Sequence, residues 1–330
     1  MTHRGEPLTA LVEAINAAQS IVVLSHYNPD ADAYGSSCGL ALALKGLGKK
    51  VVCVNENGVL PRYEFIPGVS SVSNSLPEGA WDLLITCDCG DRKRIGETLK
   101  DSLSRFPKVM NIDHHASNDL FGHLNYVVDT ASSTSEIIFD LVTELKAPLS
   151  ADVALCLFTG ISADTGSFRY ASTAAKTFAV AQRLVTAGAL PAKVSQALYG
   201  SDSLALVRLH ADAINKMELV AGGKISLITC TQAMFQTHGA LPEDADPLVE
   251  RGRDIVGVEI AVLLKQDADL WRVSLRSKHP ELDVSEVAQL FGGGGHKMAA
   301  GFRWRRDVAE LRPLLLTKLE ELLPRRSRVG

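Results

Sequence analysis

The stretch Val109-Met-Asn-Ile-Asp-His-His-Ala-Ser-Asn118 changes abruptly from apolar to ionisable side chains. Val109 to Ile112 is typical of a buried strand, and Asp113, His114 and His115 follow it directly. Three neighbouring titratable groups are costly to bury without compensating partners. The stretch therefore predicts a strand that ends at a polar site, and a cation is the simplest partner for that site.

Three other apolar runs end in the same way. Residues 21–25 lead into His26, Asp30 and Asp32, residues 83–86 lead into Asp88, and residues 155–161 lead into Asp164. The carboxyl ends of strands in an open parallel sheet lie along one edge, so residues distant in sequence converge there. We therefore expect these groups to form one site.

Ordinary structural roles remain open for the same residues. An Asp after a strand is often a turn former or a helix N-cap, which applies to Asp32, Asp88 and Asp164. His26 taken alone could be a hydrogen-bonded core histidine. Separate caps would not require histidines at two of the strand ends, so the joint pattern favours a metal site.

Composition indicates a globular enzyme with room for two domains in 330 residues. The net charge of -4 argues against a surface that grips long nucleic acid, while a short anionic substrate stays compatible. The six cysteines lie mostly in apolar runs without a disulfide-framework spacing, so we expect reduced core thiols. Because neither a membrane-spanning run nor a signal-peptide pattern is present, we expect a cytoplasmic protein.

Strand and helix patterns alternate up to about residue 190, which predicts an α/β fold with a parallel sheet covered by helices on both faces. A first amphipathic helix is expected around residues 8–15. The expected strands are 21–25, 51–54, 83–86 and 109–112, and the expected helices are 33–47, 92–104, 133–146, 151–161 and 174–187. Residues 155–161 suit a strand or a helix, and either would bring Asp164 to the site.

After Pro191 the pattern becomes that of a smaller C-terminal α+β domain. We expect hairpins over 216–229 and 260–275, a helix over 284–291, a strand over 300–304 and a helix over 308–323. The predicted boundaries are 1–187 for the first domain, 188–209 for a linker and 210–330 for the second domain.

The second domain carries a glycine run, Gly292 to Gly295, followed by His296 and Lys297. Consecutive glycines expose backbone amides to a phosphate, and the two following side chains add charge or hydrogen bonds. A flexible hinge is the alternative. Arg276, beside Ser277 at a predicted strand end, is a second candidate anion contact or else an exposed strand-end arginine.

Together these motifs resemble those of the DHH phosphoesterase superfamily. His26 to Asp32, Asp88, Asp113 to His115 and Asp164 are similar to its four motifs in order. Residues 292–301 resemble the glycine-histidine motif of the DHH-associated C-terminal domain. The compact two-domain form is similar to the NrnA-type nano-RNases, which are oligoribonucleases and pAp phosphatases.

The resemblance implies two divalent metal ions, and mixed imidazole and carboxylate ligands favour Mn²⁺. The implied ligands are His26, Asp30 and Asp88 for one ion and Asp32, Asp88, His114 and Asp164 for the other. Asp113 would orient a ligand histidine and His115 would face the substrate phosphate. The implied substrate contacts are Arg276, Ser277, Gly293, Gly294, Gly295 and His296, which makes the first domain catalytic and the second substrate-binding, with the active site in the cleft between them.

The function implied is hydrolysis of very short oligonucleotides to mononucleotides by metal-activated water, with removal of the 3'-phosphate of pAp as a further activity. The alternative is a phosphodiesterase of cyclic di-AMP or pApA in second-messenger turnover. A nucleotide-binding regulator without catalysis would lack a ligand position, and none is missing. The expected partners are short oligonucleotides or nucleotides, with no membrane and no long nucleic acid; a homodimer is compatible with the sequence.

Overall fold

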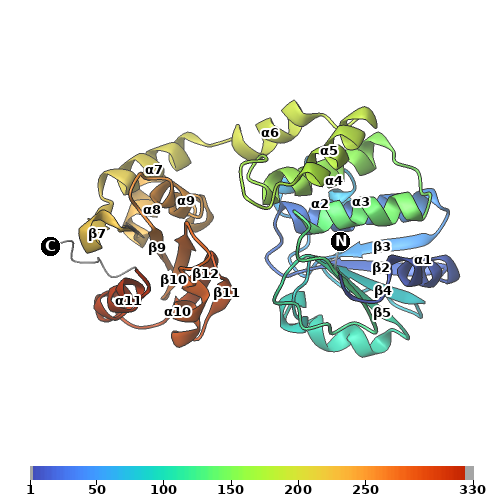
Figure 1. The fold of residues 1–330 in the computed structure, drawn as a ribbon, viewed down its shortest axis with the longest axis horizontal. Coiled ribbons are helices and arrows are strands. Elements are labelled where there is room, and N and C mark those ends of the chain that lie inside the picture. The colour runs from blue at the N-terminus through green and yellow to red at the C-terminus, as the bar shows by residue number, and fades with distance from the viewer. Residues whose placement is uncertain (1–2, 324–330) are drawn as a thin grey trace. The chain divides into compact units, whose positions relative to one another are not determined.

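The computed structural model describes residues 3–323, which form two compact units that divide between Ser201 and Asp202 (Figure 1). The predicted linker 188–209 holds helix α6 (Pro191–Tyr199) and the start of α7 (Leu204–Asn215). Each unit has its own sheet and its own core, as the alternation of sequence patterns predicted. The predicted cleft between the domains stays a prediction.

The N-terminal unit is built on a six-stranded sheet in the order β1-β6-β5-β4-β2-β3. Every pairing in it is parallel except that of β1 with β6. Its strands are β1 (Arg4–Gly5), β2 (Ser20–Ser25), β3 (Lys50–Val54), β4 (Leu83–Cys87), β5 (Val109–Asp113) and β6 (Leu124–Val127). The four predicted strands are confirmed, whereas β1 and β6 were not predicted.

Five α-helices belong to the described part of this unit before α6, and they share one core with Ile21 and Val23 on one face of the sheet, with α4 and α5 packed on α2 and α3 (Figure 1). They are α1 (Leu8–Ala17), α2 (Ala31–Gly46), α3 (Thr134–Glu144), α4 (Ala151–Asp164) and α5 (Ala175–Thr186). Residues 155–161 are therefore helical, because they lie inside α4. Asp164 is the last residue of that helix.

The opposite face of the sheet, which carries Val22 and Leu24, is covered by 3-10 helices η3 (Arg92–Ile95) and η4 (Lys100–Arg105). The prediction of one continuous helix over 92–104 is wrong. Gly96 interrupts it with a φ of +130°, and a Cβ there would meet Glu56 Oε2 at 2.2 Å. The Glu56 carboxylate accepts the next three backbone amides, which fixes a loop where a helix was expected.

Helices α2 and α4 approach unusually closely, and two glycines make this possible. A Cβ on Gly35 would lie 2.6 Å from the backbone oxygen of Cys156, and a Cβ on Gly160 would lie 2.3 Å from Asp32 Oδ1. Both distances are shorter than any real contact, so these positions require glycine. The close approach carries Asp164, at the end of α4, toward the first turn of α2.

The C-terminal unit has a mixed sheet in the order β11-β12-β10-β9-β8-β7. Its strands are β7 (Glu218–Val220), β8 (Ile225–Cys230), β9 (Ile260–Asp267), β10 (Leu270–Ser277), β11 (Gly294–His296) and β12 (Ala299–Trp304). Both predicted hairpins and the predicted strand at 300–304 are confirmed. The glycine run was not expected to form a strand, yet its second half is the edge strand β11.

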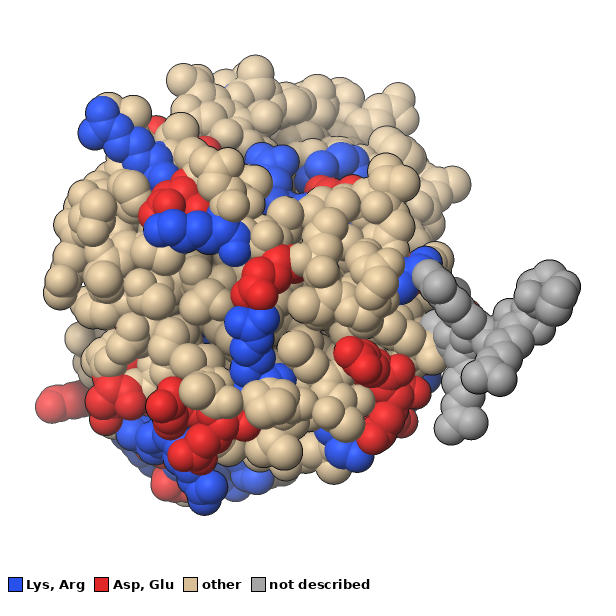
Figure 2. Space-filling model, turned by 90° about the vertical axis from the view of Figure 1, so that its left-hand side faces the viewer, with Lys and Arg blue, Asp and Glu red and all other residues tan. Residues whose placement is uncertain are grey.

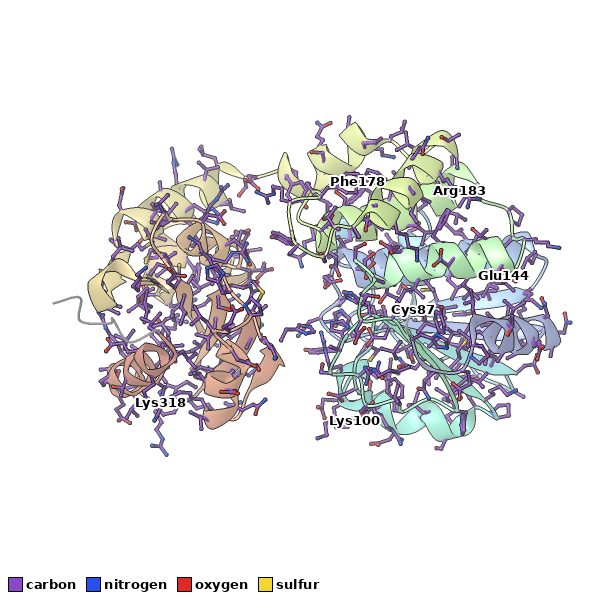
Figure 3. All side chains as sticks on the ribbon, in the orientation of Figure 1. Cys87, Lys100, Glu144, Phe178, Arg183 and Lys318 are labelled. Carbon is purple, nitrogen blue, oxygen red and sulfur yellow. The ribbon has the colours of Figure 1, made fainter. Side chains whose placement is uncertain are left out.

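Alternating residues of this sheet face two sets of helices. Val262 packs toward α10 (Val284–Leu290) and α11 (Val308–Leu322), whereas Leu263 packs toward α7, α8 (Gln232–His238) and α9 (Leu248–Arg253). Helices α10 and α11 were predicted, while α8 and α9 were not. Apolar side chains fill the interior of each unit, and the charged side chain of Lys318 lies on the outside of the C-terminal unit (Figure 3).

The surface shown in Figure 2 carries Lys and Arg side chains interspersed with Asp and Glu side chains. This face has no continuous basic stripe of the kind that long nucleic acid requires. Among the described residues, no helix combines the length and apolar character needed to cross a membrane.

Candidate metal centre

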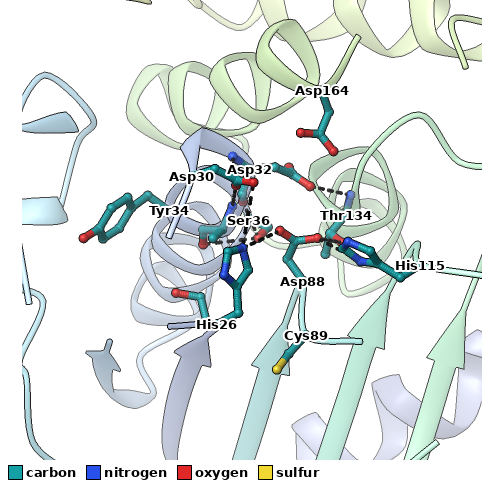
Figure 4. A network of polar contacts seen from close by, with 12 residues as sticks. His26, Asp30, Asp32, Tyr34, Ser36, Asp88, Cys89, His115, Thr134 and Asp164 are labelled. Carbon is teal, nitrogen blue, oxygen red and sulfur yellow. Dashed lines mark hydrogen bonds and ion pairs between the residues drawn. The ribbon is translucent and has the colours of Figure 1, made fainter. Parts of the chain in front are cut away.

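The neighbouring parallel strands β2, β4 and β5 deliver ionisable groups to one edge of the N-terminal sheet (Figure 4). His26 follows β2, Asp88 follows β4, and Asp113 ends β5 just before His114 and His115. Parallel pairing aligns these strand ends, which is why groups from distant parts of the sequence meet here.

The first group consists of His26, Asp30 and Asp88. His26 Nε2 lies 3.4 Å from Asp88 Oδ2 and 3.8 Å from Asp30 Oδ2. The other ring nitrogen, Nδ1, lies 2.9 Å from the backbone oxygen of Tyr27, so the neutral tautomer that donates there presents a lone pair at Nε2. Asp30 also caps α2 by accepting the amides of Asp32 and Ala33 on Oδ1, which leaves Oδ2 for His26.

The second group consists of Asp32, His114 and Asp164. His114 Nε2 lies 3.2 Å from Asp164 Oδ2 and 3.6 Å from Asp88 Oδ1. Asp88 therefore faces His26 with one carboxylate oxygen and His114 with the other, which is the arrangement of a shared ligand. Asp32 is completely buried, whereas the side chains of His114 and Asp164 are 18% and 22% exposed, so the group opens to solvent on one side.

His115 is held beside these groups by Asp113. The His115 Nδ1 atom lies 2.7 Å from Asp113 Oδ1 and 3.6 Å from Asp88 Oδ1. Asp113 is fully buried and its other oxygen accepts a 2.6 Å hydrogen bond from the side chain of Asn118. A buried carboxylate with both oxygens engaged fixes the orientation of the imidazole that it contacts.

The first turn of α3 supports the buried carboxylates of Asp32 and Asp88. Thr134 and Ser135 donate their backbone amides to the two oxygens of Asp32 at 2.7 and 3.0 Å. The Thr134 hydroxyl donates to Asp88 Oδ1 at 2.9 Å (Figure 4). Helix N-termini stabilise negative charge, so α3 compensates part of the cost of burying Asp32.

The pKa values show how strongly these groups interact. Burial alone would lower the pKa of His26, but the carboxylates of Asp30 and Asp88 raise it to about 10. Burial raises the pKa of Asp164 to about 6, although the nearby His114 acts to lower it. Burial and the charge of Asp88 also hold the pKa of Asp32 well above its usual range.

Asp88 has a backbone φ of +59°, a left-handed conformation that is uncommon for residues other than glycine. Its amide donates to the backbone oxygen of Ile112 at 3.0 Å, which holds the residue between β4 and β5. Such conformations cluster at functional sites, where the surrounding structure compensates their cost. The strained backbone at Asp88 agrees with a role that depends on the orientation of its carboxylate.

The donor set fits divalent cations. His26 is 2% exposed, and its Nε2 has no hydrogen-bond partner among the described residues although carboxylate oxygens surround it. The contacts of this nitrogen with Asp88 and Asp30, at 3.4 and 3.8 Å, are longer than normal hydrogen bonds, and a cation between the imidazole and the carboxylates would satisfy all of them. The alternative role of His26 as a hydrogen-bonded core histidine is disfavoured for the same reason.

The candidate substrate contacts lie on the C-terminal sheet. Arg276 on β10 is in register with Ala299 on β12, which is in turn in register with His296 on β11. Arg276 Nε lies 2.7 Å from Glu250 Oε1, so part of its charge is already compensated. The structure thus places Arg276 and His296 on two strands of one sheet that flank β12.

The remaining predicted contacts differ in accessibility. Ser277 is fully buried, and its hydroxyl donates to the backbone oxygen of His279 at 3.2 Å, which indicates a structural role. Gly293 and Gly295 pack against β12, where a Cβ would approach Gly301 O at 2.2 Å and Ala299 O at 2.5 Å. Gly294 has open space beside it. Gly294 and Gly295 belong to the edge strand β11.

Sequence reasoning missed the residues that support the centre, namely Thr134, Ser135, Asn118 and Gly160. The run of hydroxyl residues at 132–135 was a signal for the first two, because such side chains at a helix start bind anions and backbone amides. No local signal distinguishes Asn118 or Gly160, since their partners are distant in sequence.

Comparison with protein families gives two matches. Residues 20–161 match the N-terminal domain of the DHH family, and residues 228–324 match the DHHA1 domain. The chain is 31% identical over 299 residues to the bifunctional oligoribonuclease and PAP phosphatase NrnA of Bacillus subtilis, which covers 89% of this chain and 92% of that protein.

Solved structures share the fold. An exopolyphosphatase-related protein from Bacteroides fragilis superposes with a TM-score of 0.88 at 24% identity, covering 95% of both chains. RecJ of Thermus thermophilus, solved with Mn²⁺, gives a TM-score of 0.52 at 18% identity, covering 95% of this chain and 53% of RecJ. The predicted fold class is confirmed by this similarity.

Proposed function

This chain belongs to the DHH family, and from that premise we propose that it is a metal-dependent phosphoesterase that hydrolyses very short oligonucleotides to mononucleotides and removes the 3'-phosphate of pAp. The observation that carries the substrate class is the similarity to the Bacillus subtilis oligoribonuclease and PAP phosphatase, which extends over nearly the whole of both chains. The interspersed charges on the face in Figure 2 agree with a short substrate.

The metal ligands of this proposal are the two groups described above. His26 and Asp30 would hold one ion, Asp32, His114 and Asp164 would hold the other, and Asp88 would be shared. Imidazole and carboxylate ligands together suit Mn²⁺ better than Mg²⁺, which prefers shells made of oxygen.

When bound, such ions activate a water molecule and neutralise charge on the phosphate. The protein residues have separate tasks. His115, oriented by Asp113, would donate a hydrogen bond to the phosphate from the solvent-accessible side of the centre, since its side chain is 11% exposed. Asp88 would hold the two groups of ligands at a fixed position relative to each other. The hydrogen bond from the Thr134 hydroxyl would help to orient its carboxylate.

We propose that the C-terminal unit binds the nucleotide portion of the substrate. Arg276 and His296 are each in register with Ala299 on β12, and β11 is the last strand of this sheet in the described part of the chain. Backbone amides on such an edge, together with guanidinium and imidazole groups, suit a phosphate. Gly293 and Gly295 let the chain run close to β12, and Gly294 leaves open space beside its backbone.

The six cysteines are free and buried, which supports a reducing, cytoplasmic location. In such a compartment the enzyme would act on the short oligonucleotides that remain after other nucleases have degraded longer RNA.

The test compares four substrates with Mn²⁺ present: pApA, pAp, a long RNA and cyclic di-AMP. Fast release of AMP from pApA and of phosphate from pAp, with slow attack on the long RNA and the cyclic compound, is the expected result. Product chromatography gives the rates. Preferential opening of cyclic di-AMP would overturn the proposed substrate class, and hydrolysis that survives complete metal chelation would overturn the metal centre.

A further inference from the structure

Arg4 lies in the short strand β1 at the edge of the N-terminal sheet, in register with Val127 of β6. Contacts with β6 hold this strand in place. A Cβ on Gly5 would lie 2.1 Å from the backbone oxygen of Asn125, so only glycine allows the approach. The Glu6 amide donates to the same oxygen at 2.8 Å, and the Glu6 carboxylate accepts the Asn125 amide. The position of Arg4 is therefore fixed.

The guanidinium group of Arg4 donates to three backbone oxygens of the loop that follows β5. These are the oxygens of His115 at 3.2 Å, Ala116 at 3.1 Å and Asn118 at 3.2 Å. A planar fork with several fixed donors can hold three diverging carbonyls, whereas an ammonium group cannot reach them all in one geometry. Arg4 thus ties a segment more than one hundred residues away to the sheet edge.

The tied loop leads directly into the metal centre. Asn118 donates its side-chain amide to Asp113 Oδ2 at 2.6 Å and to Asn111 Oδ1 at 2.8 Å. Asp113 Oδ1 in turn contacts His115 Nδ1 at 2.7 Å, and that nitrogen lies 3.6 Å from Asp88 (Figure 4). Releasing the loop would therefore release both the backbone of His115 and the carboxylate that orients its ring.

We propose that Arg4 is a positioning residue for phosphoester hydrolysis: it holds the loop 115–118, and through Asn118 and Asp113 it sets the orientation of His115. All three of its described hydrogen bonds go to backbone oxygens, so it acts through His115. The inference rests on the proposed function, because it needs His115 to face the substrate.

The experiment compares Arg4→Ala and Arg4→Lys with the wild type in pApA hydrolysis. Loss of a group that orients a functional histidine costs about 10- to 100-fold. We expect kcat to fall by about that factor in Arg4→Ala while KM changes less than about 3-fold, with partial recovery in Arg4→Lys. The matched control is Lys49→Ala, because Lys49 also donates to backbone oxygens, those of Asn16 and Ala18, away from the centre.

Hydrogen exchange over residues 114–122 gives a second readout that needs no activity. In this region the Asn118 amide donates to His115 O, and the Asp119 amide donates to Gly90 O. Both amides should exchange faster than in the wild type in Arg4→Ala, and at the wild-type rate in Lys49→Ala. Faster exchange with wild-type kcat, or unchanged exchange, would overturn the positioning role. A wild-type protein inactive on pApA would instead refute the proposed function, and exchange would still report whether Arg4 holds the loop.

Discussion

The substitution Gly160→Ala should disrupt the metal centre, although it adds only one methyl group. The added Cβ would lie 2.1 Å from Ser135 Oγ and 2.3 Å from Asp32 Oδ1, both more than an ångström short of ordinary contact. Asp32 cannot move aside, because it is completely buried and accepts the amides of Thr134 and Ser135. Helix α4 must shift instead, and Asp164, one turn further along it, must shift with it.

The magnitude follows from these contacts. Overpacking of a close interface costs about 1–3 kcal/mol of stability. Misplacing reacting groups by about 1 Å costs about 100-fold in rate. We therefore expect kcat/KM for pApA to fall about 100-fold and the affinity for Mn²⁺ to fall as well. Alanine is a better helix former than glycine by about 1 kcal/mol, so its helix propensity offsets part of the expected loss of stability.

Hydrolysis of pApA, a Mn²⁺ titration and thermal unfolding measure the three effects. Gly46→Ala is the matched control, because Gly46 is also a helical glycine, the last residue of α2, but the nearest atom to its Cβ would be a side-chain carbon of Pro148 at 3.3 Å. That variant should keep wild-type activity. A Gly160→Ala protein with wild-type kcat/KM and wild-type Mn²⁺ affinity would refute the reasoning that α4 holds Asp32 and Asp164 in place as ligands.

Four further predictions concern single groups. Asp88→Ala should abolish turnover of pApA, since both ligand groups lose a member; retained activity would refute the shared-ligand assignment. Arg276→Ala should raise KM several-fold with little change in kcat, and a loss confined to kcat would contradict its role in binding. Thr134→Val should weaken Mn²⁺ binding about 10- to 100-fold by isothermal titration, because Asp88 loses a hydrogen bond, while Thr134→Ser should not. Mn²⁺ binding at pH 7.5 should release at least one proton, because His26 has a pKa of about 10 in the metal-free protein and binds metal in its neutral form. Affinity should therefore rise with pH up to about 10, and calorimetry in buffers of different ionisation enthalpy counts the protons.

The prediction of one continuous helix over 92–104 fails for a reason that local patterns do not contain. Ile95 and Leu99 suit a helix face, but tertiary burial against Val22 and the acceptance of three amides by Glu56 favour a broken 3-10 path. The short strands β1 and β6 were missed because two to four residues carry too little periodicity to be recognised.

The sequence by itself determined the type of domain, the four main strands of the first sheet and the set of ionisable residues that meet at its edge. It could do so because a buried strand and the polar residue that follows it are neighbours in the chain, as with Ile112 and Asp113. The same locality makes the hairpins and the glycine run of the second unit recognisable.

Only the tertiary structure decided how those ionisable groups are held. Arg4 contacts a loop 111 residues away, and the amide of Thr134 reaches Asp32 across 102 residues. Gly160 matters only because α2 lies against it. Such contacts depend on how helices and strands pack in three dimensions, and packing between distant segments leaves no periodic pattern in the sequence of either one.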